Sequence, residues 1–463
     1  LPRWFHDILP GTCITQANEQ SVRETTEVIR QARALTEEIL QPVRKERTVS
    51  IENTLSFDRD DVIYLDAPEG CILAGGYKQQ PATDLKGNKK LVVGGVTIPA
   101  FSAKAFDFEP GTISGVSPFR YEADKLETPF FTAVFDNRGF ISSLIDKRVR
   151  RELKGDGYAL NTFLIAEDVP GGDYDNWDID ADCECKFKDT AKLVSRSVIS
   201  DGEVEFRIRS EYKLTEKSTL RQDMIFYSES PEIRFDAIID WQDTHRFLKT
   251  AFDTTIHTDF ARHEIQFGYI ERSTNRNTAV EKAKFEVSNY KYTDISETRY
   301  GVAILNDCKY GITAKDSGLR LSLHKGGNRP DYRGDKGEHE CCYSFYPHEG
   351  GFGAAGVIRP AYMLNYKPLI CEGSLHEDSL VRVSADNIIV EAVKPLEDSE
   401  NAYLLRLYET EGTQTNTKIS FTDPVKGLAL TNMLEEVTQE LMTAQETELT
   451  FHAFEIKTLK VSY

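Results

Sequence analysis

One helical segment near the start of the chain limits what the remainder can fold into. Residues 14–40 contain neither glycine nor proline. Apolar residues recur at the spacing of one helix face at Val28, Ala32, Leu35 and Ile39. Pro42 ends this pattern. We therefore predict one long helix, whose apolar stripe must pack either on the rest of this chain or on something outside it.

After Pro42 the chain changes to short β-prone runs that are separated by glycine, proline and aspartate. In EVEFRIRSEYKL, EIRFDAIIDW and AYLLRLYE, apolar and polar residues alternate, as they do in strands with one buried face. In FDNRGFISSL (residues 135–144), an Asn-Arg-Gly turn predicts a hairpin with Gly139 at positive φ. The fold is therefore predicted to be mainly β, with antiparallel sandwich domains after the helical segment and little further helix.

Length and charge exclude several classes of protein. A chain of 463 residues predicts about three domains. Acidic residues exceed basic ones by 75 − 56 = 19, which argues against a nucleic-acid or anionic-membrane partner and is compatible with a neutral substrate such as a sugar. The sequence has no run of about 18 apolar residues, so we expect no membrane span.

The cysteines and the first residue indicate the cellular context. The eight cysteines form no paired CxxC motifs, so we expect reduced thiols in a cytoplasmic protein and no metal site built from cysteine. Leu1 stands where an initiator methionine would be, and no basic-then-apolar leader follows it. We therefore expect the chain to be a fragment or a processed product of a longer protein.

Two short stretches carry candidate site residues. In HDILPGT, His6 and Asp7 stand directly before a Pro-Gly turn, which by itself is typical of a surface loop. In PGGDYDNWDID (residues 170–180), several carboxylates and Trp177 crowd a glycine-rich loop. Sugar sites combine an aromatic face with carboxylates that accept hydroxyl hydrogen bonds. A solvated acidic loop with a tryptophan in the core, or a calcium site, are the alternatives.

Several stretches, taken in order, resemble the C-terminal half of the α-mannosidases of glycoside hydrolase family 38, in its cytosolic and bacterial branch. These stretches are FHDILPGTCI, ENTLSFDRDDVIYL, FDNRGFISSLIDKRVRREL, DYDNWDID, FGYIERSTNRNT, RPDYRGDKGEHE and GVIRPAYMLNY. Their order and spacing make the resemblance specific. It implies four parts: a segment of a three-helix bundle in 1–42, a small β domain in 43–107, a large mutarotase-like β-supersandwich in 108–378 and a β-sandwich in 379–463.

The resemblance also implies roles for individual residues. His6 would bind zinc, Asp7 would bind mannose hydroxyls, and Asp175 and Trp177 would contact substrate at the rim of the same cleft. No catalytic residue is expected in this chain. The nucleophile, the acid/base carboxylate and the other metal ligands would lie in an N-terminal barrel, because retaining glycosidases need two carboxylates at the scissile bond. The chain alone is therefore expected to be inactive, as one part of a zinc-dependent, retaining α-mannosidase of mannosyl oligosaccharides.

Two other functions compete with this interpretation. The first is a non-catalytic carbohydrate-binding or structural β-sandwich module, with a homo-oligomer as one possible assembly. The second is an aldose-epimerase-like activity, which requires a histidine and a glutamate in one cleft. The remaining histidines show no metal-binding spacing such as HxxxH, and we assign none of them to catalysis. Among these, His245 is expected to anchor a turn.

Overall fold

The computed structural model describes residues 5–8, 10–353, 356–397 and 399–463, so residues 1–4 of the predicted helical part lie outside the description. The predicted mainly β fold is confirmed. Apart from the long first helix, the described helices are short: η2 (Gln41–Val43), α2 (Cys183–Lys186), α3 (Ala279–Ala283) and α4 (Ile358–Asn365). Among the described residues, no helix has the length and apolar character that a membrane crossing needs. All eight cysteines are unpaired.

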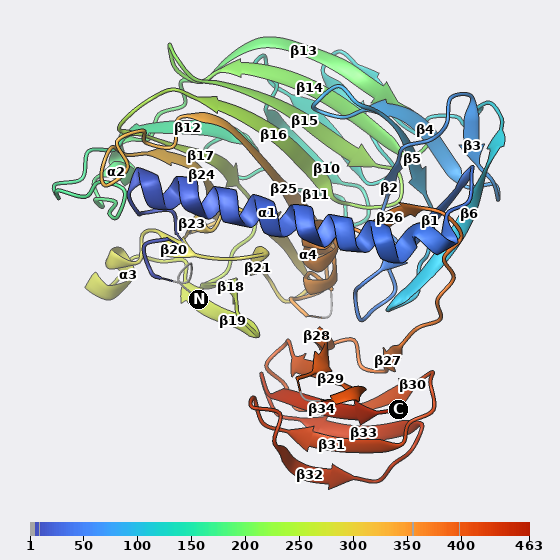
Figure 1. Cartoon of the computed structure of the whole chain (residues 1–463). Coiled ribbons are helices and arrows are strands. Elements are labelled where there is room, and N and C mark those ends of the chain that lie inside the picture. Colours follow the sequence, from blue (N-terminus) through green and yellow to red (C-terminus); the bar gives the residue numbers. More distant parts are fainter. Residues whose placement is uncertain (1–4, 9, 354–355, 398) are drawn as a thin grey trace.

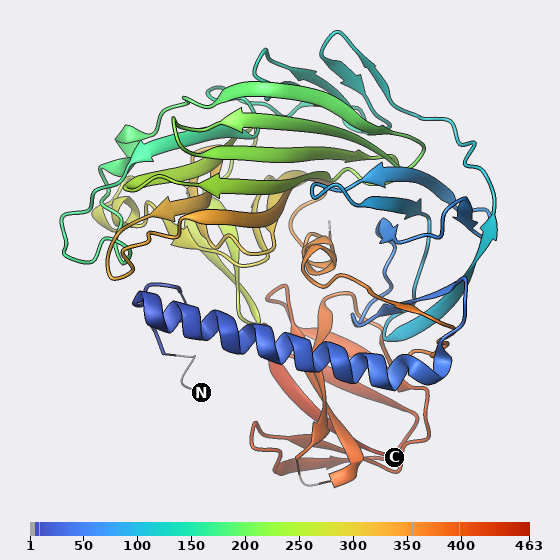
Figure 2. The same ribbon diagram turned by 45° about the horizontal axis from the view of Figure 1, so that its top comes forward.

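A curved nine-stranded sheet forms the largest layer of the molecule (Figures 1 and 2). Its strands, in spatial order, are β13 (Lys192–Asp201), β14 (Glu205–Lys213), β15 (Thr219–Tyr227), β16 (Ile233–Trp241), β25 (Gly337–Glu349), β22 (Tyr300–Asn306), β21 (Tyr292–Ser296), β18 (Phe260–Ile265) and β19 (Gly268–Ser273). Every neighbouring pair in it is antiparallel. In β16 buried apolar residues alternate with partly exposed ones over its first half, and in β22 all seven residues are buried, so the sheet forms one face of a core.

Two five-stranded sheets complete this sandwich. The first contains β12 (Thr162–Glu167), β17 (Arg246–Asp253), β24 (Gly318–Gly326), β23 (Gly311–Lys315) and β20 (Val287–Ser288). The second contains β11 (Arg151–Glu152), β10 (Ile141–Asp146), β9 (Phe131–Phe135), β8 (Lys125–Glu127) and β7 (Arg120–Glu122). Side chains of all three sheets share one apolar core. The predicted hairpin is confirmed as β9–β10, with Gly139 at φ +80°.

A smaller β region precedes the sandwich in the chain. One of its sheets orders β26 (Leu369–Glu372), β1 (Thr48–Asn53), β6 (Ser102–Pro110) and β3 (Cys71–Leu73), and the other orders β2 (Ile63–Leu65), β5 (Lys89–Gly94) and β4 (Lys78–Thr83). The two sheets enclose a core of their own. Strand β26 comes from far along the chain, and its residue Glu372 pairs with Val49 of β1. The domain boundaries after residues 42, 107 and 378 stay predictions.

Buried polar side chains join this small region to the nine-stranded sheet. The Tyr64 hydroxyl donates to Glu205 at 2.6 Å, and Glu205 accepts from Nε of Arg207 at 2.8 Å. Arg207 also donates to Asp223 at 3.0 Å. All three charged residues are at most 2% exposed. Since a buried charge is tolerated only with hydrogen-bonding partners, this cluster requires the two regions to dock in one arrangement.

The C-terminal residues form a separate sandwich with its own core. Its strands are β27 (Val381–Val383), β30 (Thr415–Phe421) and β33 (Glu446–Phe451) in one sheet, with β28 (Ile388–Leu396), β29 (Ser399–Glu409), β34 (Ile456–Ser462), β31 (Gly427–Thr431) and β32 (Val437–Leu441) in the other. In Figure 1 this sandwich lies below the rest of the molecule.

The predicted long helix is confirmed as α1 (Thr15–Leu40). It runs as one long, unbroken helix in both views (Figures 1 and 2). Of its residues only Thr15 is buried. In the stripe, Val28 is 64%, Leu35 58% and Ile39 65% exposed. Packing of the stripe on the described β regions, one of the two alternatives, is therefore wrong, because these side chains stay exposed.

Candidate functional site

His6 and Asp7 lie side by side in a tight turn that leads into α1. The Ile8 amide donates to the Phe5 carbonyl at 2.9 Å, and Gly11 closes the turn at φ +76°. Nε2 of His6 lies 3.3 Å from Oδ1 of Asp7, and the His6 side chain is 69% exposed. Oδ1 of Asp7 is buried and makes no hydrogen bond within the described part of the chain. The turn thus holds an accessible imidazole beside a partly exposed carboxylate, and the imidazole is a near polar neighbour of the buried Oδ1.

Trp177 lies directly against His6, although 171 positions separate the two residues in the chain. Their ring centroids are 5.8 Å apart at an interplanar angle of 71°. The Trp177 side chain is half exposed. The resemblance predicted both residues at one cleft, and the structure places their rings in edge contact. We call His6, Asp7 and Trp177 together the His6 face.

Asp175 turns inward and organises the loop that carries Trp177. Its Oδ1 accepts from the amides of Asn328 at 2.8 Å and Arg329 at 2.7 Å, and its Oδ2 lies 2.7 Å from Nε2 of His245. Burial raises the pKa of Asp175, but these two amides and His245 outweigh it and hold the pKa below its usual value. A carboxylate with three such partners fixes loops together and has little capacity left for a ligand.

The loop of residues 326–335 connects the two candidate stretches. Asp331 accepts from the Thr15 hydroxyl at 2.7 Å and from Nδ2 of Asn18 at 3.2 Å, which ties this loop to the first turn of α1. Gly327 packs so closely on Asn176 that a Cβ atom there would lie 1.9 Å from its Oδ1. A side chain at residue 327 would therefore displace the Trp177 loop.

The sequence did not identify two residues that contribute to this site, His245 and Asp331. His245 was expected only to anchor a turn, which it does: it has φ +54°, and its amide donates to Gly326 at 2.6 Å. Its bond to Asp175 and the bonds of Asp331 to α1 join residues far apart in the chain, so no local spacing reveals them. The only signal for Asp331 was its place in the family-like stretch RPDYRGDKGEHE.

The donor set of the His6 face fits part of a zinc site. Zinc takes imidazole nitrogen and carboxylate oxygen, and it needs three or four protein ligands. The described residues contain no group of three His, Cys, Asp or Glu side chains that could hold a metal ion. His6 and Asp7 have the right chemistry but are too few. A metal at His6 would require further ligands from outside the described residues.

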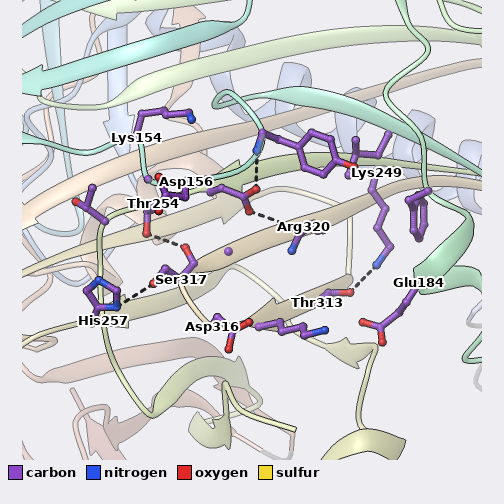
Figure 3. A pocket seen from close by; sticks show the side chains of 18 of the residues that line it. Lys154, Asp156, Glu184, Lys249, Thr254, His257, Thr313, Asp316, Ser317 and Arg320 are labelled. Carbon is purple, nitrogen blue, oxygen red and sulfur yellow. Dashed lines mark hydrogen bonds and ion pairs between the residues drawn. The ribbon is translucent and has the colours of Figure 1, made fainter.

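A cavity outside the His6 face lies on the outer face of the sheet that contains β17, β24 and β23 (Figure 3). Its volume is about 910 Å³, and none of its lining residues belongs to the His6 face. It contains His257 and two glutamates. In Figure 3, His257 and Glu184 lie at opposite ends. The Glu152 carboxylate already accepts from the Leu144 amide at 2.7 Å and from the Lys154 amide at 2.9 Å. This geometry does not favour the epimerase-like alternative, which needs the two groups to act together.

Comparison with known proteins points to one family. The model of the "Glycosyl hydrolases family 38 C-terminal domain" matches residues 126–333, and that of the "Glycosyl hydrolases family 38 C-terminal beta sandwich domain" matches residues 387–459. Human "Alpha-mannosidase 2C1" is 28% identical over 98% of this chain and 44% of its own length. "Alpha-mannosidase G" of Dictyostelium discoideum is 32% identical over 72% of this chain and 32% of its own length.

A solved structure shows the same fold. The alpha-mannosidase from Enterococcus faecalis V583 superposes with a TM-score of 0.78 at 14% sequence identity, covering 99% of this chain and 62% of that protein. The chain thus spans less than half the length of the curated relatives named above.

Proposed function

This chain belongs to glycosyl hydrolase family 38 and corresponds to its C-terminal part, and from that premise we propose that it completes the active site of an α-mannosidase. The whole enzyme would hydrolyse α-mannosidic bonds in oligosaccharides with retention of configuration. The nucleophile, the acid/base carboxylate and the other metal ligands would come from a catalytic barrel that precedes this chain. The cytoplasmic location and a possible homo-oligomer stay predictions.

The observation that carries the proposal is the His6 face itself. An exposed imidazole, a partly exposed carboxylate and a half-exposed indole come together from two distant stretches. Trp177 would cover the apolar face of a sugar ring. Asp7 would accept hydrogen bonds from its hydroxyls. His6 would be one ligand of a zinc ion, which binds sugar hydroxyls and acts as a template and Lewis acid.

The exposed stripe of α1 supports the same arrangement. Val28, Leu35 and Ile39 form an apolar surface along the C-terminal half of the helix, and the described β regions leave it uncovered. An exposed apolar stripe of this kind is unfavourable in water and indicates a surface that packs against another part of the protein. We propose that the preceding barrel and its own helices cover it.

Asp175 would act as a positioning residue in this site. Sequence similarity suggested direct contact with substrate, which stays a prediction. Its three hydrogen-bonding partners favour a role in which it holds the Trp177 loop against Asn328 and Arg329. An Asp175→Ala protein would then lose affinity for substrate through displacement of Trp177, whose fluorescence would report the change.

The test uses the protein with its preceding region present. We expect His6→Ala to lose bound zinc and nearly all mannoside hydrolysis, because losing one of so few ligands empties or distorts a zinc site. Asp7→Ala should keep the metal and bind substrate about ten- to a hundredfold more weakly, because a hydrogen bond to a charged group contributes roughly 1.5–3 kcal/mol. Elemental analysis after dialysis and hydrolysis kinetics separate the two effects.

His376→Ala is the matched control, since His376 is exposed and lies outside the His6 face. It should keep both metal and turnover. Full zinc occupancy and normal turnover in His6→Ala would instead favour the non-catalytic alternative, in which the chain is a carbohydrate-binding or structural module.

A further inference from the structure

A second cavity, of about 400 Å³, opens where the β18–β19 turn, α4 and β28 meet. These elements lie in the centre of Figure 1, between the large sandwich and the C-terminal one. None of the lining residues belongs to the His6 face. Five of them are aromatic: Phe267, Tyr290, Tyr310, Tyr362 and Tyr366. A cavity of this size with a largely aromatic wall has the character of a small-molecule site.

The polar groups of this cavity fall into two sets. One set is already engaged: Nζ of Lys291 donates to Glu264 at 2.7 Å, and the Tyr362 hydroxyl donates to one oxygen of Glu391 at 2.5 Å. The other set is open. Among the described residues, no hydrogen bond is made by the hydroxyls of Tyr290, Tyr310 and Tyr366 or by the side-chain amide of Gln266. Open donors and acceptors thus surround aromatic faces.

The charges decide which ligand fits. A cation over the Tyr362 ring is excluded, because Nζ of Lys291 already occupies that position, 4.5 Å from the ring centroid. An anion would face Glu391, and the only lysine of the lining is neutralised by Glu264. A neutral ligand with many hydroxyls satisfies both conditions. Its hydroxyls would pair with the open phenols and amide, and its C–H faces would pack on the rings.

We propose that this cavity, which we call the tyrosine pocket, binds a neutral saccharide at a distance from the His6 face. The ligand class follows from the pocket alone, whereas the identity of the sugar as mannose rests on the proposed function. A second sugar contact on the same chain would hold one branch of an oligosaccharide while another reaches the His6 face.

Saturation-transfer NMR titration of the full chain with methyl α-D-mannopyranoside tests this. The variant Tyr310→Ala/Tyr366→Ala removes two rings that are 49% and 43% exposed, so it opens no hole in a core. The double variant loses both ring contacts with the sugar, so we expect it to bind about tenfold more weakly. Tyr310→Phe/Tyr366→Phe keeps both rings and should lose less affinity, which provides a second test should the alanine variant fold poorly.

Two controls locate the binding. Tyr158→Ala alters the cavity of about 910 Å³ beside β17, β24 and β23 and should leave the affinity unchanged. Trp177→Ala alters the His6 face and should leave the tyrosine-pocket binding intact. An unchanged affinity in the double variant, a loss of all binding in Trp177→Ala alone, or displacement of the sugar by tetramethylammonium would overturn the inference. A pocket that binds methyl β-D-galactopyranoside and not the mannoside would keep the site but refute the link to mannose, independently of the metal and hydrolysis assays.

Discussion

Helices α1 and α4 are stabilised in opposite ways. Helix α4 has eight residues, and four of them are buried in the core that it shares with β22 and the C-terminal sandwich. Helix α1 has 26 residues, and one of them is buried. In water a short isolated helix is marginal, so α4 exists because of its packing. Helix α1 is long enough to form locally, and its contacts with the chain are concentrated at its first turn. The comparison shows that the longer helix is the less integrated one.

The largest expected effect is on the packed helix. Leu364→Ala removes a buried side chain from the α4 core, and leucine-to-alanine changes in cores cost about 2–5 kcal/mol through lost burial and a residual cavity. Chemical denaturation of the full chain should show this loss of unfolding free energy. A loss of unfolding free energy below about 0.5 kcal/mol would show that the packing of α4 contributes as little to stability as α1 does.

A smaller effect is expected where α1 is anchored. Asp331→Ala removes the acceptor of Thr15 and Asn18, and hydrogen bonds to a charged group contribute roughly 1.5–3 kcal/mol each. Because the loss is local, hydrogen exchange in the first turn of α1 should accelerate about tenfold or more while global stability changes less. Glu19→Ala is the control: it breaks only the exposed Arg333–Glu19 pair, which should contribute under about 1 kcal/mol. Equal effects of both variants would contradict the anchor.

The same anchor should depend on pH. Burial raises the pKa of Asp331, but the hydrogen bonds from Thr15, the Arg333 amide and Asn18 outweigh it and hold the pKa below its usual value. A depressed carboxyl pKa stabilises the folded state above the unfolded pKa, about 3.9, and this contribution is lost as the pH falls through the folded value. Hydrogen exchange in the first turn of α1 at graded pH, corrected for the intrinsic exchange rate, should show release of this turn only below about pH 4. Release near neutral pH would be inconsistent with control by Asp331.

The smallest loss of unfolding free energy is expected from a substitution in the exposed apolar stripe of α1. Leu35→Ala makes the same substitution as in α4, but at a side chain that is more than half exposed. In the chain as described, the unfolding free energy should change by less than about 0.5 kcal/mol. With the preceding region present the loss should grow toward the core value, because the stripe would then be covered. A large loss in this chain alone would mean that α1 packs on a β region after all.

The sequence predicted what depends on periodicity and missed what depends on distant contacts. The 3.6-residue pattern of α1 and the alternation of the strands specify their own geometry, so both were predicted. Helix α4 was missed because it spans only eight residues, Pro360 lies in its first turn, and its stability comes from tertiary packing. His6 and Trp177 were predicted as neighbours from the family resemblance. The inward orientation of the Asp175 side chain was not predicted, because its partners His245, Asn328 and Arg329 contact it only in the folded chain.

The position of β26 beside β1 has a consequence for the newborn polypeptide. The Ser50 hydroxyl donates to the Gly373 carbonyl across 323 positions of the chain, so one edge of β1 gains its partner only after most of the protein has been translated. At roughly 5–20 residues per second, that edge stays open for roughly 15–65 seconds on the ribosome. An unpaired strand edge is a template for pairing with other chains. Crowded polysomes, where neighbouring nascent chains expose the same edge, are therefore the setting in which this protein is most exposed to misassembly.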